Sequence, residues 1–162
     1  MTSDSPPAGP QLPRAAEVRE VLGFVPLVEA YFRRGPGEMP DELAEIFAAH
    51  RLTARHGAVL PQLAAGGTLG VSDLAARMGV SLSTVSELVG TLSRAGLVDR
   101  REDPDNRRRT LVSLAEQHRA AVEGFVAVRA APLLRVLDTL SPRDRQGFVA
   151  GLVAWASEVQ RT

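Results

Sequence analysis

Cysteine and lysine are both absent from this chain of 162 residues. Without cysteine the chain cannot form a disulfide, hold a metal through thiolates or sense oxidants through a thiol, and it suits a reducing cytoplasm. No apolar run approaches the roughly 20 residues that a bilayer-spanning helix needs. The first residues have neither the basic start nor the apolar stretch of a signal peptide. We therefore expect a cytoplasmic protein that does not bind membranes.

The charges balance, because 19 arginines face 19 aspartates and glutamates. A net charge of zero predicts weak non-specific binding to nucleic acid, although phosphate contacts need only a local basic face. Arginine suits phosphate and guanine better than lysine does. A genome-wide codon bias is nevertheless the simpler explanation for the use of arginine in place of lysine throughout the chain.

Helical spacing of apolar residues dominates both ends of the chain. It predicts a helix over 15–34 that is kinked at Pro26, a second over 40–50, and a third that Thr53 caps and that reaches about Ala65. After the central region it predicts a long helix over 114–140 with a bend at Pro132. The Ser141-Pro142 pair, with Asp144 in capping position, starts a last helix that runs to about Gln160.

The central stretch from Val71 to Leu114 predicts two short helices and a β-hairpin. Ser72 is expected to cap a helix over 73–78, and Gly79 supplies a left-handed turn. Ser81 then caps a second helix that continues to about Ala95. Two β-rich segments, 97–101 and 108–114, flank an Asp-Pro-Asp turn sequence, and Thr68-Leu69 supplies a third strand. This succession is typical of a winged helix-turn-helix.

The predicted fold class is mainly α with a small three-stranded antiparallel sheet: a winged helix-turn-helix with a helical dimerisation region from both chain ends. We expect a disordered tail over 1–14, dimerisation helices over 15–52 and 115–162, and a DNA-binding domain over 53–114. The apolar terminal helices suit either a bundle within one chain or a dimer interface built from both chain ends. The dimer is favoured because two recognition helices about one DNA turn apart require two subunits.

Short hydroxyl side chains near the start of the second helix, and arginines around the hairpin tip, suit phosphates, base edges and a narrow minor groove. The predicted DNA-binding residues are Ser81, Ser83, Thr84, Ser86, Glu87, Arg94, Arg101, Asn106, Arg107, Arg108 and Arg109. Each hydroxyl taken singly is equally explained by capping or solvation. The helix has no Asn or Gln to read adenine, so base discrimination is expected to be modest or to depend on DNA shape.

The stretch VSDLAARMGVSLSTVSELVGTLSRAGLVDRREDPDNRRRTLVSL resembles the MarR family of bacterial transcriptional regulators. The shared features are the helix-turn-helix, the step Gly96-Leu97-Val98 and a wing with Asp103-Pro104. Asn106 departs from the pattern, because the family usually has there an aspartate that pairs with arginine and braces the wing. Asn106 can still form hydrogen bonds but carries no charge.

The resemblance implies a homodimer on a pseudo-palindromic double-stranded DNA site. Its recognition helix, 81–95, would enter the major groove, and Arg107 or a neighbour would reach the minor groove. It also implies a repressor that a small aromatic or phenolic effector releases from DNA. Cysteine-based oxidant sensing, which some members use, is impossible here.

Candidate effector-binding residues gather at the start of the third predicted helix: His50, Arg51, Arg55 and His56. An arginine or histidine there can pair with a carboxylate or phenolate. The alternative is that they are surface or helix-end residues. Neither the His50/His56 pair nor His118 has metal-ligand spacing, so we predict no metal.

Two other functions compete with a ligand-responsive repressor. The first is a winged-helix module that binds DNA without an effector, or binds a protein partner instead. The second is an enzyme, but the sequence has no glycine-rich cofactor loop, nucleophile elbow or paired catalytic carboxylates. We therefore predict that the chain is not an enzyme and has no cofactor.

Overall fold

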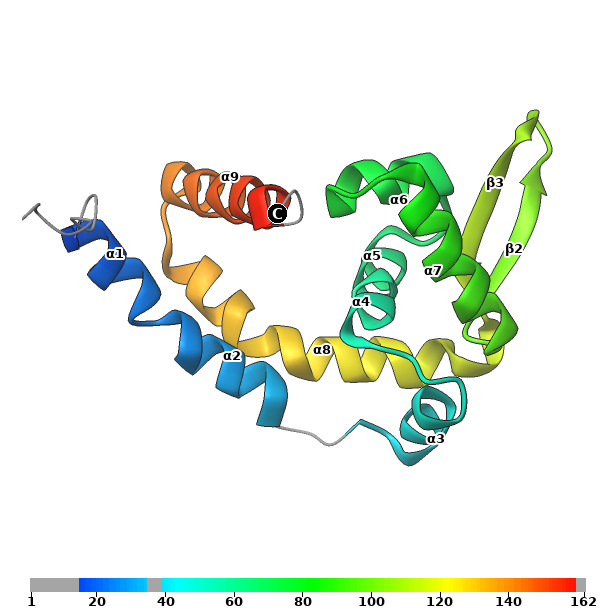
Figure 1. Ribbon diagram of the computed structural model, residues 1–162, viewed down its shortest axis with the longest axis horizontal. Helices are drawn as coiled ribbons and strands as arrows, with labels where there is room; N and C mark the ends of the chain where they lie inside the picture. The colour runs from blue at the N-terminus through cyan, green and yellow to red at the C-terminus, as the bar shows by residue number, and fades with distance from the viewer. Residues whose placement is uncertain (1–14, 35–38, 160–162) are drawn as a thin grey trace, which may run out of the picture. The chain divides into compact units, whose positions relative to one another are not determined.

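The computed structural model describes residues 15–34 and 39–159 of the chain (Figure 1). The predicted disordered tail over 1–14 lies outside these residues. Contacts divide the chain into two compact units, Met1–Pro36 and Gly37–Thr162. No helix in the described part is both long and apolar enough to cross a membrane.

The first unit contains α1 (Ala15–Leu22) and α2 (Val25–Arg34). The prediction of one kinked helix was therefore wrong, because the helix ends before Pro26 rather than bending at it. Proline has no N–H, and its ring would clash with the carbonyl oxygen of Leu22, four residues earlier. The helix restarts when the N–H of Val28 donates to the oxygen of Phe24 at 3.1 Å.

The second unit surrounds a three-stranded antiparallel sheet of order β1-β3-β2. Its elements in chain order are α3 (Asp41–Ala49), α4 (Ala54–Gly57), α5 (Val59–Gly66), β1 (Leu69–Gly70), α6 (Val71–Met78), α7 (Leu82–Arg94), β2 (Val98–Asp103), β3 (Asn106–Leu114), α8 (Glu116–Thr139) and α9 (Pro142–Val159). The mainly helical class with a small three-stranded sheet is confirmed. The third strand lies at Leu69–Gly70, one residue beyond the predicted pair.

The third predicted helix is split into α4 and α5, which meet at Ala58. Pro61 explains the break, because its ring would meet the carbonyl of Gly57 and it has no N–H to donate. The start at Thr53 is as predicted: the N–H of Thr53 donates to His56 Nδ1 at 3.0 Å in a capping box. His56 therefore has a structural role at this helix start.

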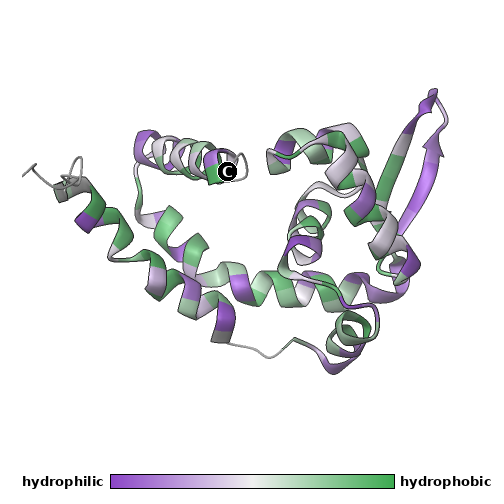
Figure 2. Ribbon diagram, in the orientation of Figure 1, coloured by the Kyte–Doolittle hydropathy of each residue, from purple (hydrophilic) through white to green (hydrophobic). Residues whose placement is uncertain are grey.

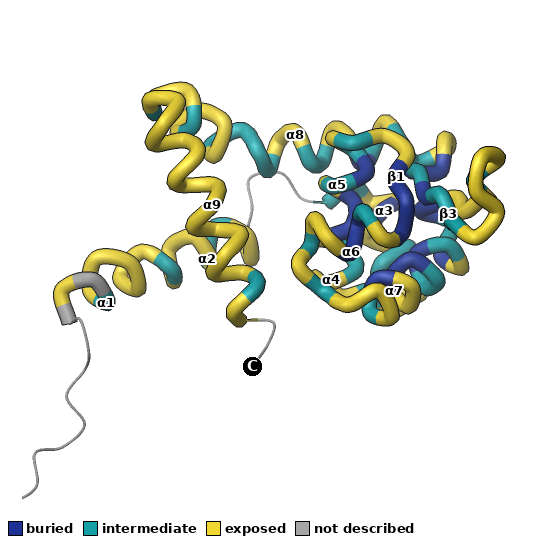
Figure 3. Tube along the Cα trace, turned by 90° about the horizontal axis from the view of Figure 1, so that it is seen from above, coloured by how far each residue is buried: buried dark blue, intermediate teal, exposed yellow. Residues whose placement is uncertain are grey.

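The hydrophobic core lies within the winged helix-turn-helix, with contributions from α3 and the first half of α8 (Figure 3). Its fully buried side chains come from every layer of this region: Leu43, Val59, Leu63, Leu74, Val85, Val89, Leu92, Leu97, Val98, Val112, Leu114 and Val122. No residue of α9 is buried. The core therefore holds the helix-turn-helix and the wing together without the last helix.

The long helix α8 continues through Pro132, and Figure 1 shows it changing direction towards its C-terminal end. The start of α9 is as predicted, because Ser141 Oγ accepts the N–H of Asp144 at 3.2 Å. Arg145 then closes the corner by donating from Nη2 to the oxygen of Leu137 at 2.7 Å. Near the other end of α8, the hydrogen bond to Glu116 raises the pKa of Arg119 above its usual value.

Candidate nucleic-acid interface

The first helix of the pair, α6, starts two residues earlier than predicted. Its N-cap is Gly70 rather than Ser72, and the Gly70 N–H donates to Asp73 Oδ2 at 3.3 Å. Asp73 stands at the third helical position, where a carboxylate can satisfy a free N–H and favour the positive end of the helix dipole. The residue that caps α6 is therefore also the last residue of β1. The sheet and the helix are joined with no loop between them.

The turn between the helices forms as the sequence predicts. Gly79 ends α6 with φ 66° and ψ 28°, in the left-handed region that favours glycine. Ser81 caps α7, because its Oγ accepts the N–H of Thr84 at 3.1 Å. The same hydroxyl lies 2.9 Å from Ser83 Oγ and 2.8 Å from Thr84 Oγ1. These hydroxyls form one polar cluster at the start of α7.

The helix α7 has two distinct faces. One packs into the core through Val85, Leu88, Val89 and Leu92. The opposite face is exposed and carries Ser83, Ser86, Glu87 and Arg94, with Thr84 and Thr91 half-buried along its edge. Arg94 Nη2 donates to Thr91 Oγ1 at 2.9 Å. The exposed face has the short polar side chains that can approach phosphates and base edges closely.

The wing is longer than predicted, because strands β2 and β3 leave only Pro104 and Asp105 at the tip. Asp103 pairs with Asn106 across this turn, and the Asp105 N–H donates to Asp103 Oδ1 at 3.0 Å. The predicted segments, 97–101 and 108–114, left residues 102–107 between them, so the turn is tighter than predicted. The outer residues of this segment join the ladder because Asp103 fixes a tight turn around Pro104.

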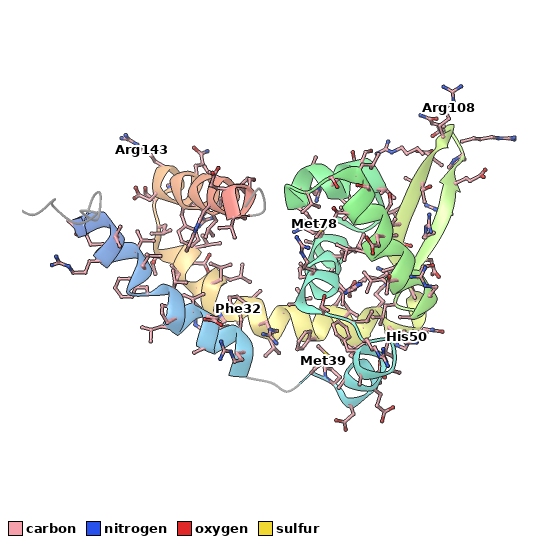
Figure 4. The ribbon with its side chains drawn as sticks, in the orientation of Figure 1. Phe32, Met39, His50, Met78, Arg108 and Arg143 are labelled. Carbon is pink, nitrogen blue, oxygen red and sulfur yellow. The ribbon has the colours of Figure 1, made fainter. Side chains whose placement is uncertain are left out.

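The pairing of β2 with β3 shifts in register close to the tip of the wing, where the arginines of β3 lie. Glu102 pairs with Thr110, but Asp103 pairs with Asn106, so the three residues 107–109 form an irregularity in β3. Asn106 Oδ1 accepts the N–H of Arg108 at 3.2 Å, which orders the start of this segment. Arg101, Arg107 and Arg108 are exposed. Figure 4 shows Arg108 at the tip of the hairpin.

Arg109 differs from the other wing arginines, because it is half-buried and ion-paired. It pairs with Asp73 of α6, and its Nη1 lies 3.9 Å from Asp103 Oδ2. Gly70 makes room for this pair, since a Cβ there would lie 2.6 Å from Arg109 Nε. The wing is thus fastened to α6 through Arg109. Sequence reasoning missed Asp73, although a carboxylate three residues after Gly70 is a capping signal.

The four candidate effector residues do not share one site. His50 and Arg51 are exposed in the turn after α3, whereas His56 caps α4. Arg55 lines an open cleft of about 480 Å³. Its other lining residues, which include Arg77, come from five helices and two connecting segments: Ala54, Ala58, Gln62, Arg77, Met78, Val80, Thr84, Leu88 and Ala156.

His118 takes part in a contact between helices rather than in this cleft. Its Nδ1 lies 3.3 Å from Glu42 Oε1, which links α8 to α3. Among the described residues, no three side chains of His, Asp or Glu gather in a group that could hold a metal ion.

A core-packed helix pair, a capped second helix with an exposed polar face and a two-stranded wing together define a winged helix-turn-helix protein. Residues 52–110 match the MarR family. The match covers the helix-turn-helix and most of the wing, so over this segment the chain is similar to MarR-family regulators.

Two curated relatives come from Bacillus subtilis (strain 168). The uncharacterized HTH-type transcriptional regulator YfiV is 37% identical over 86 residues, which are 53% of this chain and 54% of that protein. The HTH-type transcriptional repressor YetL is 27% identical over 81 residues, which are 50% of this chain and 48% of that protein. The chain thus matches about half the length of each relative.

Among solved structures, that of NadR in complex with 4-hydroxyphenylacetate superposes with a TM-score of 0.53. The superposition covers 96% of this chain and 99% of that one, at 18% sequence identity. At this identity the likeness shows the fold alone.

Proposed function

We propose that this protein is a dimeric transcriptional regulator that binds double-stranded DNA through α7 and the wing. The observation that supports it most directly is the exposed polar face of α7 beside a wing with free arginines. Within the described residues, Arg107 and Arg108 form no ion pair, whereas Arg109 is paired with two aspartates. Two cations therefore remain available for phosphate or the minor groove.

We infer different tasks for the two elements. The start of α7, where Ser81, Ser83 and Thr84 cluster, would face the DNA backbone and the major-groove edges. The wing would follow the backbone to the adjacent minor groove, where Arg107 and Arg108 find a strongly negative potential. Arg109 would hold the wing at a fixed angle to α6.

The apolar residues that the fold leaves exposed support the proposal of a dimer. They recur on the helices of both chain ends and appear as green segments in Figure 2: Phe24, Leu27, Val28, Phe32, Val128, Leu134, Phe148, Leu152, Val153 and Trp155. Exposed apolar residues of this kind, in each unit taken by itself, are typical of an interaction site. We propose that segments 15–52 and 115–162 form the dimer interface and that 53–114 binds DNA.

We also propose that the protein is a cytoplasmic repressor that a small effector releases from DNA. The name of YetL as a repressor supports the first part. The NadR complex with 4-hydroxyphenylacetate shows that the same fold can hold an aromatic acid. Here the cleft with Arg55 and Arg77 suits such a molecule, because it combines two cations with apolar walls and no acidic residue.

Selection from random duplex DNA at near-physiological salt tests this function. We expect the purified protein to enrich an inverted repeat with half-sites about one helical turn apart. The variant with Arg107→Ala and Arg108→Ala is the matched control, and it should enrich the repeat poorly while keeping its fold. If the folded wild-type protein enriches no sequence, the chain instead binds a protein partner or needs another factor.

A further inference from the structure

The last turn of α9 touches the helix-turn-helix of the same chain at the turn between its two helices. The helix α9 is described over its whole length, and every residue in it is exposed except Ser157. A Cβ on Gly79 would lie 2.9 Å from Ser157 Oγ and 3.7 Å from Ser157 Cβ. The backbone of the turn and the side chain of Ser157 are therefore in close contact.

The same end of α9 forms a wall of the cleft described above. Ala156 lines it together with Thr84 and Leu88 of α7 and with Met78 and Val80 on either side of Gly79. In Figure 1 the C-terminal end of α9 faces α6, and Figure 4 shows Met78 on that side of the helix-turn-helix. The contact thus lies along the flank of the first turn of α7.

This position conflicts with DNA binding in the proposed orientation. Gly79 precedes the N-cap Ser81 by only two residues, and Thr84 belongs to the hydroxyl cluster expected to face DNA. DNA phosphates approach a recognition helix at its N-terminus. An α9 seated beside Gly79 would compete with the DNA backbone for this flank of α7.

We propose that the last turn of α9 is an autoinhibitory latch that closes on the turn at Gly79 and opens when the protein binds DNA. The latch rests on the proposed DNA-binding function. The packing of α9 is suited to this role, because it buries no residue and its single partly buried side chain is small. Within its own chain, little buried surface holds α9 in place. Since α9 also carries apolar residues proposed for the dimer interface, the latch would couple subunit arrangement to DNA binding.

A reversible disulfide provides the sharpest test, because the native chain has no cysteine. The 3.7 Å separation between a Cβ at Gly79 and the Cβ of Ser157 falls within the roughly 3.5–4.5 Å that a disulfide requires. The variant Gly79→Cys/Ser157→Cys should therefore cross-link within one chain on oxidation. Mass measurement without reductant distinguishes this product from a cross-linked dimer, which would place the contact between subunits and overturn the proposal.

The cross-linked variant is then titrated with a duplex selected by the wild-type protein. We expect the oxidised form to bind at least tenfold more weakly than the same preparation after reduction. The two single-cysteine variants serve as controls and should bind equally before and after treatment with oxidant. Equal affinity of the oxidised and reduced double variant would overturn the latch. If the wild-type protein itself selects no duplex, the DNA-binding proposal fails and the latch fails with it.

A second variant opens the latch without a strained residue at Gly79. Ser157→Gln places a longer side chain against the turn and should displace α9, so that DNA affinity rises several-fold. The matched control is Val159→Gln, at an exposed position two residues later, which should bind DNA like the wild type. Equal affinity of the Ser157→Gln variant and the wild type would contradict the proposal, provided that both remain folded.

Discussion

Helices α7 and α9 both carry regularly spaced apolar residues, but those of α7 are buried and those of α9 are exposed. The helix α7 buries Val85, Leu88, Val89 and Leu92, whereas α9 leaves Phe148, Leu152 and Trp155 exposed. The difference lies in what surrounds each helix. Elements close in sequence pack against α7, while the apolar side chains of α9 are only partly covered within the described part of their own chain. Apolar periodicity thus predicts a buried face without showing whether the same chain or a second copy covers it.

The largest expected effect is the loss of a core side chain from α7. Leu92 is fully buried, so Leu92→Ala should lower the free energy of unfolding by about 2–5 kcal/mol through lost burial and a residual cavity. The matched change in α9 is Leu152→Ala, at a side chain that is 43% exposed. At a protein concentration low enough to keep the chain monomeric, it should cost less than about 1 kcal/mol. Urea unfolding of both variants checks this, and equal losses would refute the contrast.

The local character of the helix-turn-helix explains why so much of it could be predicted. The cap at Ser81, the left-handed Gly79 and the Asp103-Pro104-Asp105 turn depend on neighbours within a few residues. The bond between Asp73 and Arg109 joins residues 36 positions apart, and no local pattern reveals it. The breaks before Pro26 and Pro61 were missed for another reason: apolar spacing continues across them although the backbone hydrogen bonds do not.

Assembly should be the next most sensitive property. Phe148 is 39% exposed on α9, and Phe148→Asp places a charge where we expect the partner subunit. The dimer dissociation constant should rise at least about tenfold, or about 1.4 kcal/mol, in sedimentation equilibrium. Gln146→Asp adds the same charge on α9 without removing an apolar side chain, so it should remain dimeric. If Phe148→Asp leaves the dimer intact, these exposed residues do not form its interface.

A substitution in the wing should have a smaller effect, which changes DNA binding without changing stability. Arg107 is exposed and unpaired among the described residues, so Arg107→Ala should leave the free energy of unfolding unchanged. It should weaken DNA binding and reduce the slope of log affinity against log salt by about 0.9 for the lost phosphate contact. The matched control is Arg143→Ala, which removes an exposed arginine from α9 (Figure 4). Equal slopes for the two variants would place the wing tip away from DNA.

The smallest expected effect lies in the turn that leads from α3 into the winged helix-turn-helix. Among the described non-glycine residues, Arg51 alone has a positive φ, at 52°. The turn is otherwise well formed, because the Leu52 N–H donates to the oxygen of Phe47 at 2.8 Å, as in a glycine-ended helix.

Arg51→Gly should therefore raise the free energy of unfolding, since the strain of an L side chain in the left-handed region outweighs the greater entropy of unfolded glycine. We expect a gain of about 0.5–1 kcal/mol in urea unfolding. Arg51→Ala is the control that separates backbone strain from the arginine side chain, because alanine keeps the Cβ and should give no gain. Equal stabilisation by both substitutions would assign the effect to the charge of Arg51 instead. A gain confined to glycine would mean that this turn retains arginine at a cost in stability, which is a reason to test Arg51 for a role in binding.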